Sequence, residues 1–390
     1  MGLAQNFKAY VVSTFAECVL PPDAAPAGAA VIDVMVILHM FDPKPDEEAP
    51  ARRLAAVLWE SFCDCPAAAL CFDVSASTPR AKEMEWSRRP APATPQTAED
   101  IEEALMFDSF ADYRALVSSR EARSLLCRWL VDQMAARLRR RDGATRRLLV
   151  LGDDVPKLFT PDGAEARPDL ARTMHGEADV SGIFAAHVLR SHLGADGPVE
   201  CRTSDTDWVL IAALNRFPGL RVRLHHFDRA SRSVKVVTVD PGALAEASTR
   251  RYGVSELEWA ALVASRGTDF VDRLVSGLTD WDAYMSACAS ALRAAKRRRG
   301  EAAGDAVDAE ALHSAFVSAS AAAPRSKLRY ERNDGALARL AWHVLYMANC
   351  PLRGGDGLDC LDFGWRLDEA GRVAHRKVKP RLFGLATEAV

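Results

Sequence analysis

Residues 29–40 read AAVIDVMVILHM, an almost unbroken apolar run with one acid, Asp33, inside it. A run of this kind is typical of a strand that is buried on both faces of a parallel sheet. Similar runs recur along the chain and alternate with segments of helical periodicity. We expect further strands within 68–74, 148–151 and 209–213, and helices over 119–139 and 181–193. This alternation predicts an α/β fold with a mostly parallel sheet flanked by helices.

The rest of the chain divides at a charged, Gly-containing stretch. We expect a core over residues 1–295, a linker over 296–310 and a mainly helical C-terminal extension over 311–390. Within the core, about 90–147 leaves the sheet and returns as an inserted helical segment. Shorter elements are also predicted: a hairpin from 221–227 and 233–239, and helices over 255–265 and 337–349.

Composition excludes several classes of protein. The formal net charge is −3, and the apolar content of 49% is too high for a wholly disordered chain. No stretch approaches the roughly 18–20 apolar residues of a membrane span, and the N-terminus lacks a secretory signal pattern. We therefore expect an intracellular protein, nuclear or cytoplasmic, that has no membrane partner. The nine cysteines form no CxxC pair, which argues against a disulfide framework and a zinc ribbon.

A set of acids stands at the ends of the predicted strands or beside helices. One interrupts the first apolar run, one closes the second, a pair precedes the run at 209–213, and the others lie beside predicted helices. The acids are Asp33, Asp73, Glu177, Asp179, Asp205, Asp207 and Asp269. In open α/β sheets the active crevice lies outside the carboxyl ends of the strands, so these positions are candidates for chemistry.

An acid inside a buried strand must be paired, protonated or bound to a metal, because an unpaired buried carboxylate costs several kcal/mol. That requirement applies to Asp33 and Asp73. Hard divalent ions such as Mg²⁺ or Mn²⁺ prefer oxygen ligands, and two of them about 4 Å apart promote in-line phosphoryl displacement by water. The pattern therefore indicates phosphodiester hydrolysis. For any single acid, a helix cap or a solvated loop position is the alternative.

Six short motifs, in order, resemble those of the FEN/XPG-type 5′ nucleases and the related Xrn 5′→3′ exoribonucleases, which share a PIN-like sheet. They are MGL (1–3), VIDVMVILH (31–39), CFDV (71–74), HGEADV (175–180), SDTDWVL (204–210) and GTDF (267–270). The resemblance implies a PIN-like 5′-nuclease core in which the inserted segment takes the place of a helical arch. It also implies that all seven acids bind two Mg²⁺ or Mn²⁺ ions, directly or through water.

The resemblance extends to residues that would contact a nucleic-acid substrate. PRAKEMEWSRR (79–89) resembles the Xrn segment that grips the 5′ phosphate, which implies that Lys82 and Arg88 lie near the scissile phosphate. His39 stands where Xrn enzymes place a His that stacks on the terminal base. The residues assigned to substrate binding are His39, Arg80, Arg89 and Gly2.

The sequence leaves the substrate open between RNA and DNA with a 5′ end or a single-strand/duplex junction. Residues 271–285 lack the GIGPxxA pattern of flap endonucleases, which favours RNA slightly. Two other hypotheses remain. One is a catalytically inactive PIN-like scaffold that binds nucleic acid or serves in assembly. The other is an unrelated phosphatase or nucleotidase on an α/β sheet. The KRRR run at 296–299 is a weak nuclear-import candidate or simply a basic linker.

Overall fold

The computed structural model describes most of the chain. The described residues are 10–11, 14–43, 50–73, 113, 116–117, 120–140, 147–152, 155–173, 178–191, 196–228, 233–267, 273–277, 280–299, 306–322, 328–353, 365–367, 373–375 and 382–384. No helix among them is both long enough and apolar enough to cross a membrane. Seven cysteines whose side chains the structure describes are free thiols: Cys18, Cys63, Cys65, Cys71, Cys127, Cys201 and Cys288.

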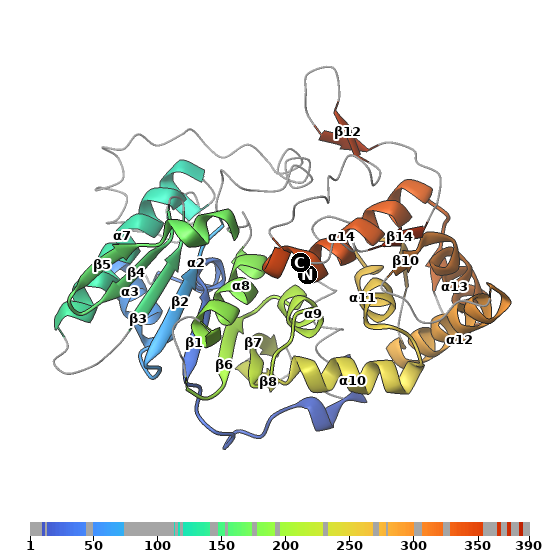
Figure 1. Ribbon diagram of the computed structural model, residues 1–390, viewed down its shortest axis with the longest axis horizontal. Coiled ribbons are helices and arrows are strands. Elements are labelled where there is room, and N and C mark those ends of the chain that lie inside the picture. The colour runs from blue at the N-terminus through green and yellow to red at the C-terminus, as the bar shows by residue number, and fades with distance from the viewer. Residues whose placement is uncertain are drawn as a thin grey trace.

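A single eight-stranded sheet organises the fold, in the order β5-β4-β3-β2-β1-β6-β7-β8 (Figure 1). Five successive strands, from β3 to β7 in this order, are parallel, and β4, β5 and β8 join by antiparallel pairing. The strands are β1 (Ala29–Asp33), β2 (Ala67–Cys71), β3 (Arg147–Leu151), β4 (Lys157–Thr160), β5 (Gly163–Ala166), β6 (Val199–Thr203), β7 (Leu220–Asp228) and β8 (Ser233–Val239). The predicted α/β class with a mostly parallel sheet is confirmed.

Alternate side chains of the central strands enter two separate hydrophobic clusters, one on each face. Ala30 and Ile32 of β1 pack with α2 (Val34–Met40), α3 (Pro50–Glu60) and α7 (Arg120–Arg140). Ala29 and Val31 belong to the larger cluster on the opposite face. Every residue of β1 and β2 is buried, as expected of strands covered on both sides.

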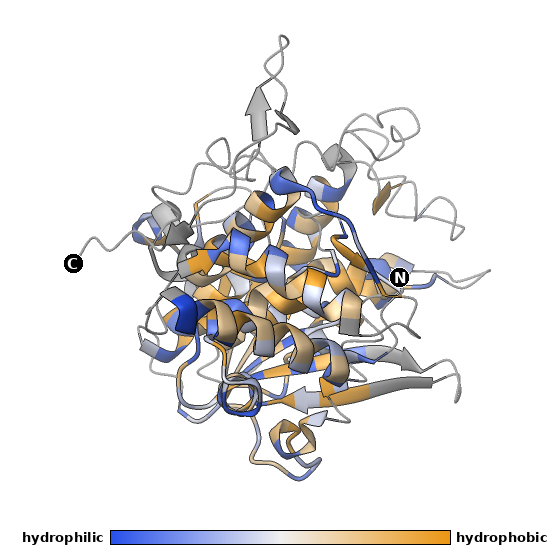
Figure 2. Ribbon diagram, turned by 90° about the vertical axis from the view of Figure 1, so that its right-hand side faces the viewer, coloured by the Kyte–Doolittle hydropathy of each residue, from blue (hydrophilic) through white to orange (hydrophobic). Residues whose placement is uncertain are grey.

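The larger cluster is built from seven helices. They are α8 (Ala178–Ser191), α9 (Asp207–Leu214), α10 (Pro241–Tyr252), α11 (Glu256–Ala264), α12 (Trp281–Arg299), α13 (Ala309–Ala322) and α14 (Asp334–Arg353). In Figure 2 the ribbons of the packed helices are mostly in the hydrophobic colour, and hydrophilic stretches lie towards the outside. Gly182 of α8 lets the ring of the fully buried Trp208 approach, since an added Cβ would lie 1.9 Å from that ring.

The minor elements complete the described structure. Two 3₁₀ helices, η1 (Ala16–Cys18) and η2 (Pro168–Thr173), lie outside the sheet. Short antiparallel pairs join β9 (Val275–Ser276) to β11 (Arg329–Tyr330), β10 (Ala306–Asp308) to β14 (Leu382–Gly384), and β12 (Trp365–Leu367) to β13 (Val373–His375).

Two of the predicted strands are wrong in part or in whole. The run at 29–40 is a strand only as far as Asp33, where the chain turns directly into α2. The run at 209–213 is not a strand but the interior of the buried helix α9. A helix buried on all sides carries the same continuous apolar sequence as a buried strand, so periodicity does not separate them. The neighbouring strand is β6, which has Glu200 and Arg202 on one face.

The other predicted elements agree with the structure. The hairpin is formed by β7 and β8, and the helices expected at 119–139, 181–193, 255–265 and 337–349 are α7, α8, α11 and α14. Much of the arch-like segment (90–147) lies outside the described residues. The division into domains stays a prediction. Residues 296–299 of the expected linker form the last turn of α12, and 306–308 form β10.

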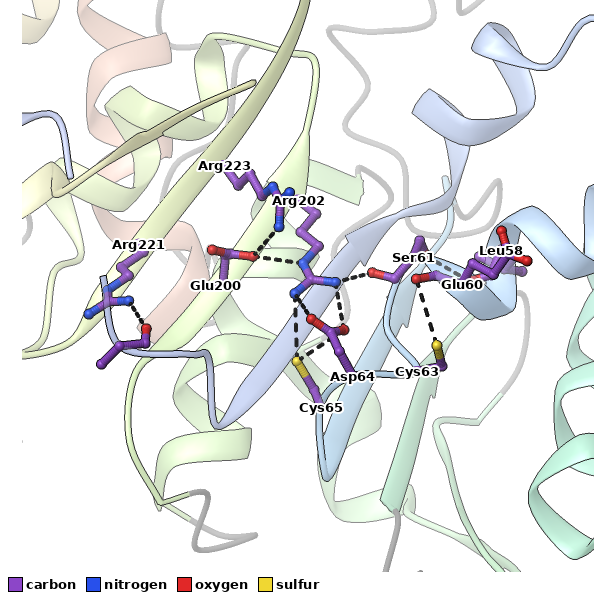
Figure 3. Close-up of polar contacts among 11 residues, drawn as sticks. Leu58, Glu60, Ser61, Cys63, Asp64, Cys65, Glu200, Arg202, Arg221 and Arg223 are labelled. Carbon is purple, nitrogen blue, oxygen red and sulfur yellow. Dashed lines mark hydrogen bonds and ion pairs between the residues drawn. The ribbon is translucent and has the colours of Figure 1, made fainter. Parts of the chain in front are cut away.

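Arg202 joins β6 to the segment before β2 (Figure 3). Its guanidinium donates to both carboxylate oxygens of Asp64 at 3.0 and 2.9 Å and to the carbonyl oxygen of Ser61. It also pairs with Glu200 at 2.8 Å, and Glu200 contacts Arg223 of β7. The Arg202 side chain is 10% exposed, and its hydrogen bonds lower the pKa of Asp64. These contacts therefore tie β6 to residues 61–64, which lead into β2.

Candidate active site

Asp33 ends β1 at the point where the strand order reverses. β1 lies between β2 and β6, both parallel to it, so its carboxyl end is the topological switch point of the sheet. Asp33 is only 5% exposed. One of its oxygens accepts a hydrogen bond from the backbone nitrogen of Val36 at 3.3 Å, so the residue also caps α2. Asp33 therefore caps a helix and also lies at the candidate site, so the two roles do not exclude each other.

Thr203 connects two of the predicted acids and was missed by the sequence analysis. Its hydroxyl donates to Asp33 at 3.1 Å and accepts from the backbone nitrogen of Asp205 at 3.0 Å. Thr203 is 1% exposed and is the last residue of β6. The sequence does carry a sign of this role, since Thr203 directly precedes the SDTD motif at 204–207. The expected strand at 209–213 lies after that motif, so Thr203 was not recognised as the end of a strand.

Asp73 follows β2 and reaches the start of α8. Its carboxylate accepts a hydrogen bond from the backbone nitrogen of Ala178, the first residue of α8, at 3.1 Å. Asp179 lies in the first turn of the same helix and is half-buried. The structure therefore places Asp73 beside the motif that contains Asp179.

Asp205 and Asp207 stand at the start of α9. Asp205 is exposed, and its carboxylate accepts from the backbone nitrogen of Asp207 at 3.0 Å. Asp207 is the first residue of α9 and is half-buried. His39 is exposed in the last turn of α2, the helix that begins next to Asp33. Helices α2, α8 and α9 thus all begin near these acids, and helix N-termini favour negative charge.

Burial and two neighbouring carboxylates control the ionisation of Asp33. Burial raises its pKa most, and the negative charges of Asp73 and Asp205 raise it further, to about 8. The hydrogen bonds from Val36 and Thr203 act in the opposite direction. The structure therefore brings Asp33, Asp73 and Asp205 within electrostatic reach of one another, at a cost in free energy to the fully ionised, metal-free state.

Seven predicted site residues lie outside the described residues. They are Gly2, Arg80, Lys82, Arg88, Arg89, Glu177 and Asp269. Within the described ranges, no group of three or more His, Cys, Asp or Glu side chains is arranged to hold a metal ion. The acids seen to lie near one another are those at the ends of β1, β2 and β6.

The raised pKa of Asp33 predicts how stability changes with pH in metal-free protein. The group titrates near 3.8 in the unfolded chain and near 8 in the folded one. Between these values the folded state keeps a proton that unfolding releases, so the Asp33 contribution falls as pH rises, by at most about 1.4 kcal/mol per pH unit. It is complete below about pH 4 and lost above about pH 8.

We expect urea unfolding in EDTA to show a fall in the free energy of unfolding between about pH 5 and about pH 8 that is larger in the wild-type chain than in Asp33→Asn. The difference between the two proteins isolates Asp33, because the other titrating groups are shared. Parallel pH profiles for the two proteins would show that Asp33 is ionised in the folded state.

Comparisons with known proteins give distant likenesses. No protein-family model and no curated protein matches the chain. Human GEN1, solved in complex with Holliday junction DNA, has a TM-score of 0.35 and 11% identity over 89% of this chain and 78% of that one. The T5 D15 protein, co-crystallised with metal ions, has a TM-score of 0.34 and 14% identity over 84% and 91%. The bacteriophage T5 flap endonuclease, in a complex with DNA and metal ions, has 0.35 and 11% over 86% and 95%.

Proposed function

We propose that the chain is a divalent-metal-dependent nuclease that hydrolyses phosphodiester bonds of RNA or DNA at 5′ ends or single-strand/duplex junctions. The observation that carries the proposal is the gathering of Asp33, Asp73 and Asp205 at the switch point of the sheet. The order of the acidic motifs along the sequence supports it, and so does the burial of Asp33 next to two other carboxylates.

The chemistry of these groups fits Mg²⁺ or Mn²⁺. All are carboxylates, which are the ligands that hard divalent cations prefer, and their mutual repulsion is relieved when a cation lies among them. We assign Asp33, Asp73, Asp179, Asp205 and Asp207 to cation binding, together with Glu177 and Asp269 from the motif pattern. Two bound ions would supply an activated water and charge stabilisation for the phosphoryl displacement.

The surrounding residues keep the acids in position. Thr203 holds the Asp33 carboxylate and the Asp205 backbone at once. The Asp73 carboxylate is fixed on the first turn of α8 through Ala178. Side chains held in this way are preorganised, so binding of a cation costs little rearrangement of the protein. His39, Lys82, Arg88, Arg80, Arg89 and Gly2 are the proposed contacts to the nucleic acid.

Cleavage of matched substrates tests the function. DNA flaps and single-stranded RNA, each labelled at the 5′ or the 3′ end, are incubated with the wild-type chain and with Asp205→Ala/Asp207→Ala in Mn²⁺. We expect cleavage by the wild-type chain only, and its loss in EDTA. The comparison of labels separates exonuclease from endonuclease cutting, and the preferred substrate separates RNA from DNA. Binding without cleavage of any substrate would replace the proposal by the inactive scaffold.

A further inference from the structure

The C-terminal ends of α10 and α12 meet next to each other. β8 is antiparallel to β7 and returns the chain to the amino-terminal edge of the sheet, where α10 begins at Pro241. α10 runs along the lower side of the molecule in Figure 1 and ends next to α12. The carboxylates at the ends of β1 and β6 lie at the opposite edge. None of the described residues at this junction belongs to the candidate active site, so the junction is a separate feature of the molecule.

Basic side chains from both helices gather at this junction. Arg250 is in the last turn of α10, and Arg293, Lys296 and Arg297 share one face of α12 because they are three or four residues apart. We call these four residues the α10/α12 basic surface. Lys296 belongs to the KRRR run that the sequence analysis left without a role. Here that run ends a helix rather than forming a linker.

Two of the four cations are held by the protein. The guanidinium of Arg293 donates to the carbonyl oxygen of Tyr252 and packs over Gly253, which ends α10 with a positive φ of 62°. Lys296 pairs with the nearly buried Glu258 at 2.7 Å. These contacts fix the position of the α12 end against α10.

Arg250 and Arg297 are exposed, and neither has a carboxylate partner among the described residues. Their acidic neighbours are engaged elsewhere: Glu256 pairs with Arg216, and Asp282 pairs with Arg251. Glu246, which is exposed, is the acid on the rim of the junction. With four cations against Glu246 and Glu258, the surface keeps a net positive charge.

An open cavity of about 480 Å³ lies between the two helices. Its lining includes Arg250 and Lys296, the hydroxyl residues Thr249 and Ser255, and the backbone at Gly253. Ser255 caps α11, so the positive end of that helix dipole also points to this region. Guanidinium groups, hydroxyls and a helix N-terminus are the groups that bind phosphate in proteins.

We propose that the α10/α12 basic surface is a second phosphate-binding site, which holds the backbone of a nucleic acid away from the catalytic edge. The identity of the polyanion rests on the proposed function, whereas the site itself rests on the cations and the cavity. Contacts to phosphate are independent of base sequence, so this surface adds affinity and not sequence specificity.

Salt dependence of binding tests the proposal. A fluorescent single-stranded RNA and a fluorescent duplex DNA are titrated in EDTA, which separates binding from cleavage. For Arg250→Gln/Arg297→Gln we expect the slope of log affinity against log salt to fall by about 1.4 on single strands or about 1.8 on duplex. Between 50 and 200 mM salt, the affinity of the double variant would therefore fall by a factor about tenfold smaller than that of the wild-type chain. Arg298→Gln is the control for the loss of one nearby charge, because Arg298 is exposed on the same turn and is rotated about 100° around the helix from Arg297.

An unchanged slope in the double variant would overturn the proposal, as would a slope change of the same size in Arg298→Gln. Binding of a fluorescent poly-glutamate peptide at this surface, with no effect of the double variant on nucleic acid, would assign it to an acidic protein partner instead and would also overturn it. If the wild-type chain cuts no substrate and the double variant still loses the slope, the proposed function fails while the phosphate site stands.

Discussion

Asp33→Asn is expected to lower kcat/KM for metal-dependent cleavage by about 10³-fold, which corresponds to about 4 kcal/mol of lost transition-state stabilisation. The substitution removes one negative charge from the switch point of the sheet. It keeps the shape of the side chain and an oxygen that accepts from Val36, and asparagine caps helices as well as aspartate does. A loss of cleavage therefore reports on the charge of Asp33 and not on the cap of α2.

Asp240→Asn is the matched control for this prediction. Asp240 caps α10 in the same manner, accepting from the backbone nitrogen of Ala243 at 2.9 Å, but it lies at the other edge of the sheet. We expect its cleavage rate to equal that of the wild-type chain. Steady-state cleavage of a labelled substrate in Mn²⁺ measures both variants. Full activity in Asp33→Asn would assign Asp33 to helix capping alone.

Arg202→Met is expected to lower the free energy of unfolding by about 2–4 kcal/mol, the second large effect. The methionine fills the apolar part of the space but leaves Glu200, whose side chain is 11% exposed, with a single longer contact to Arg223 at 3.4 Å. It also removes the hydrogen bonds that tie β6 to Asp64 and Ser61. Removing one member of a buried ionic network costs more than removing an exposed pair.

Arg221→Met provides the comparison. Arg221 lies on the adjacent strand β7, is opposite Glu200 in register, and donates to the carbonyl oxygen of Ala25 at 2.6 Å in an exposed position. We expect its substitution to cost less than about 1 kcal/mol. Urea unfolding of the two variants measures the difference. Equal losses would show that the Arg202 network contributes no more than an ordinary surface hydrogen bond.

The sequence predicts the class of fold because the buried strands β1, β2 and β3 are short apolar runs. It fails at 209–213, where the apolar run forms the buried helix α9. It also misses β6, because Glu200 and Arg202 interrupt the apolar pattern of that strand. These two polar residues are buried only through their pairing with one another, with Arg223 and with Asp64. That pairing depends on tertiary contacts between segments more than a hundred residues apart, which periodicity does not reveal.

Three of the predicted acids lie near one another in the structure, although one of the elements around them was predicted wrongly. The acids at Asp33, Asp73 and Asp205 approach one another even though the strand next to Asp205 was misplaced. A strand over 209–213 would have put Asp205 at the amino end of that strand, whereas the structure puts it after β6, at the carboxyl edge of the sheet. The motif pattern, and not the strand assignment, predicted that Asp205 belongs with Asp33 and Asp73. Thr203 was missed because a hydroxyl that positions two carboxylates has no charge pattern of its own. The ligand roles of all seven acids stay predictions.

Binding of Mn²⁺ to the metal-free chain at about pH 8 tests the central claim most directly, because it needs no substrate. Electron paramagnetic resonance of free Mn²⁺ gives the affinity of the wild-type chain, Asp33→Asn and Asp240→Asn. We predict that the wild-type chain and Asp240→Asn bind the ion alike and that Asp33→Asn binds it at least about tenfold more weakly. Equal Mn²⁺ affinity in all three proteins, or no binding by the wild-type chain, would contradict a metal centre at the end of β1.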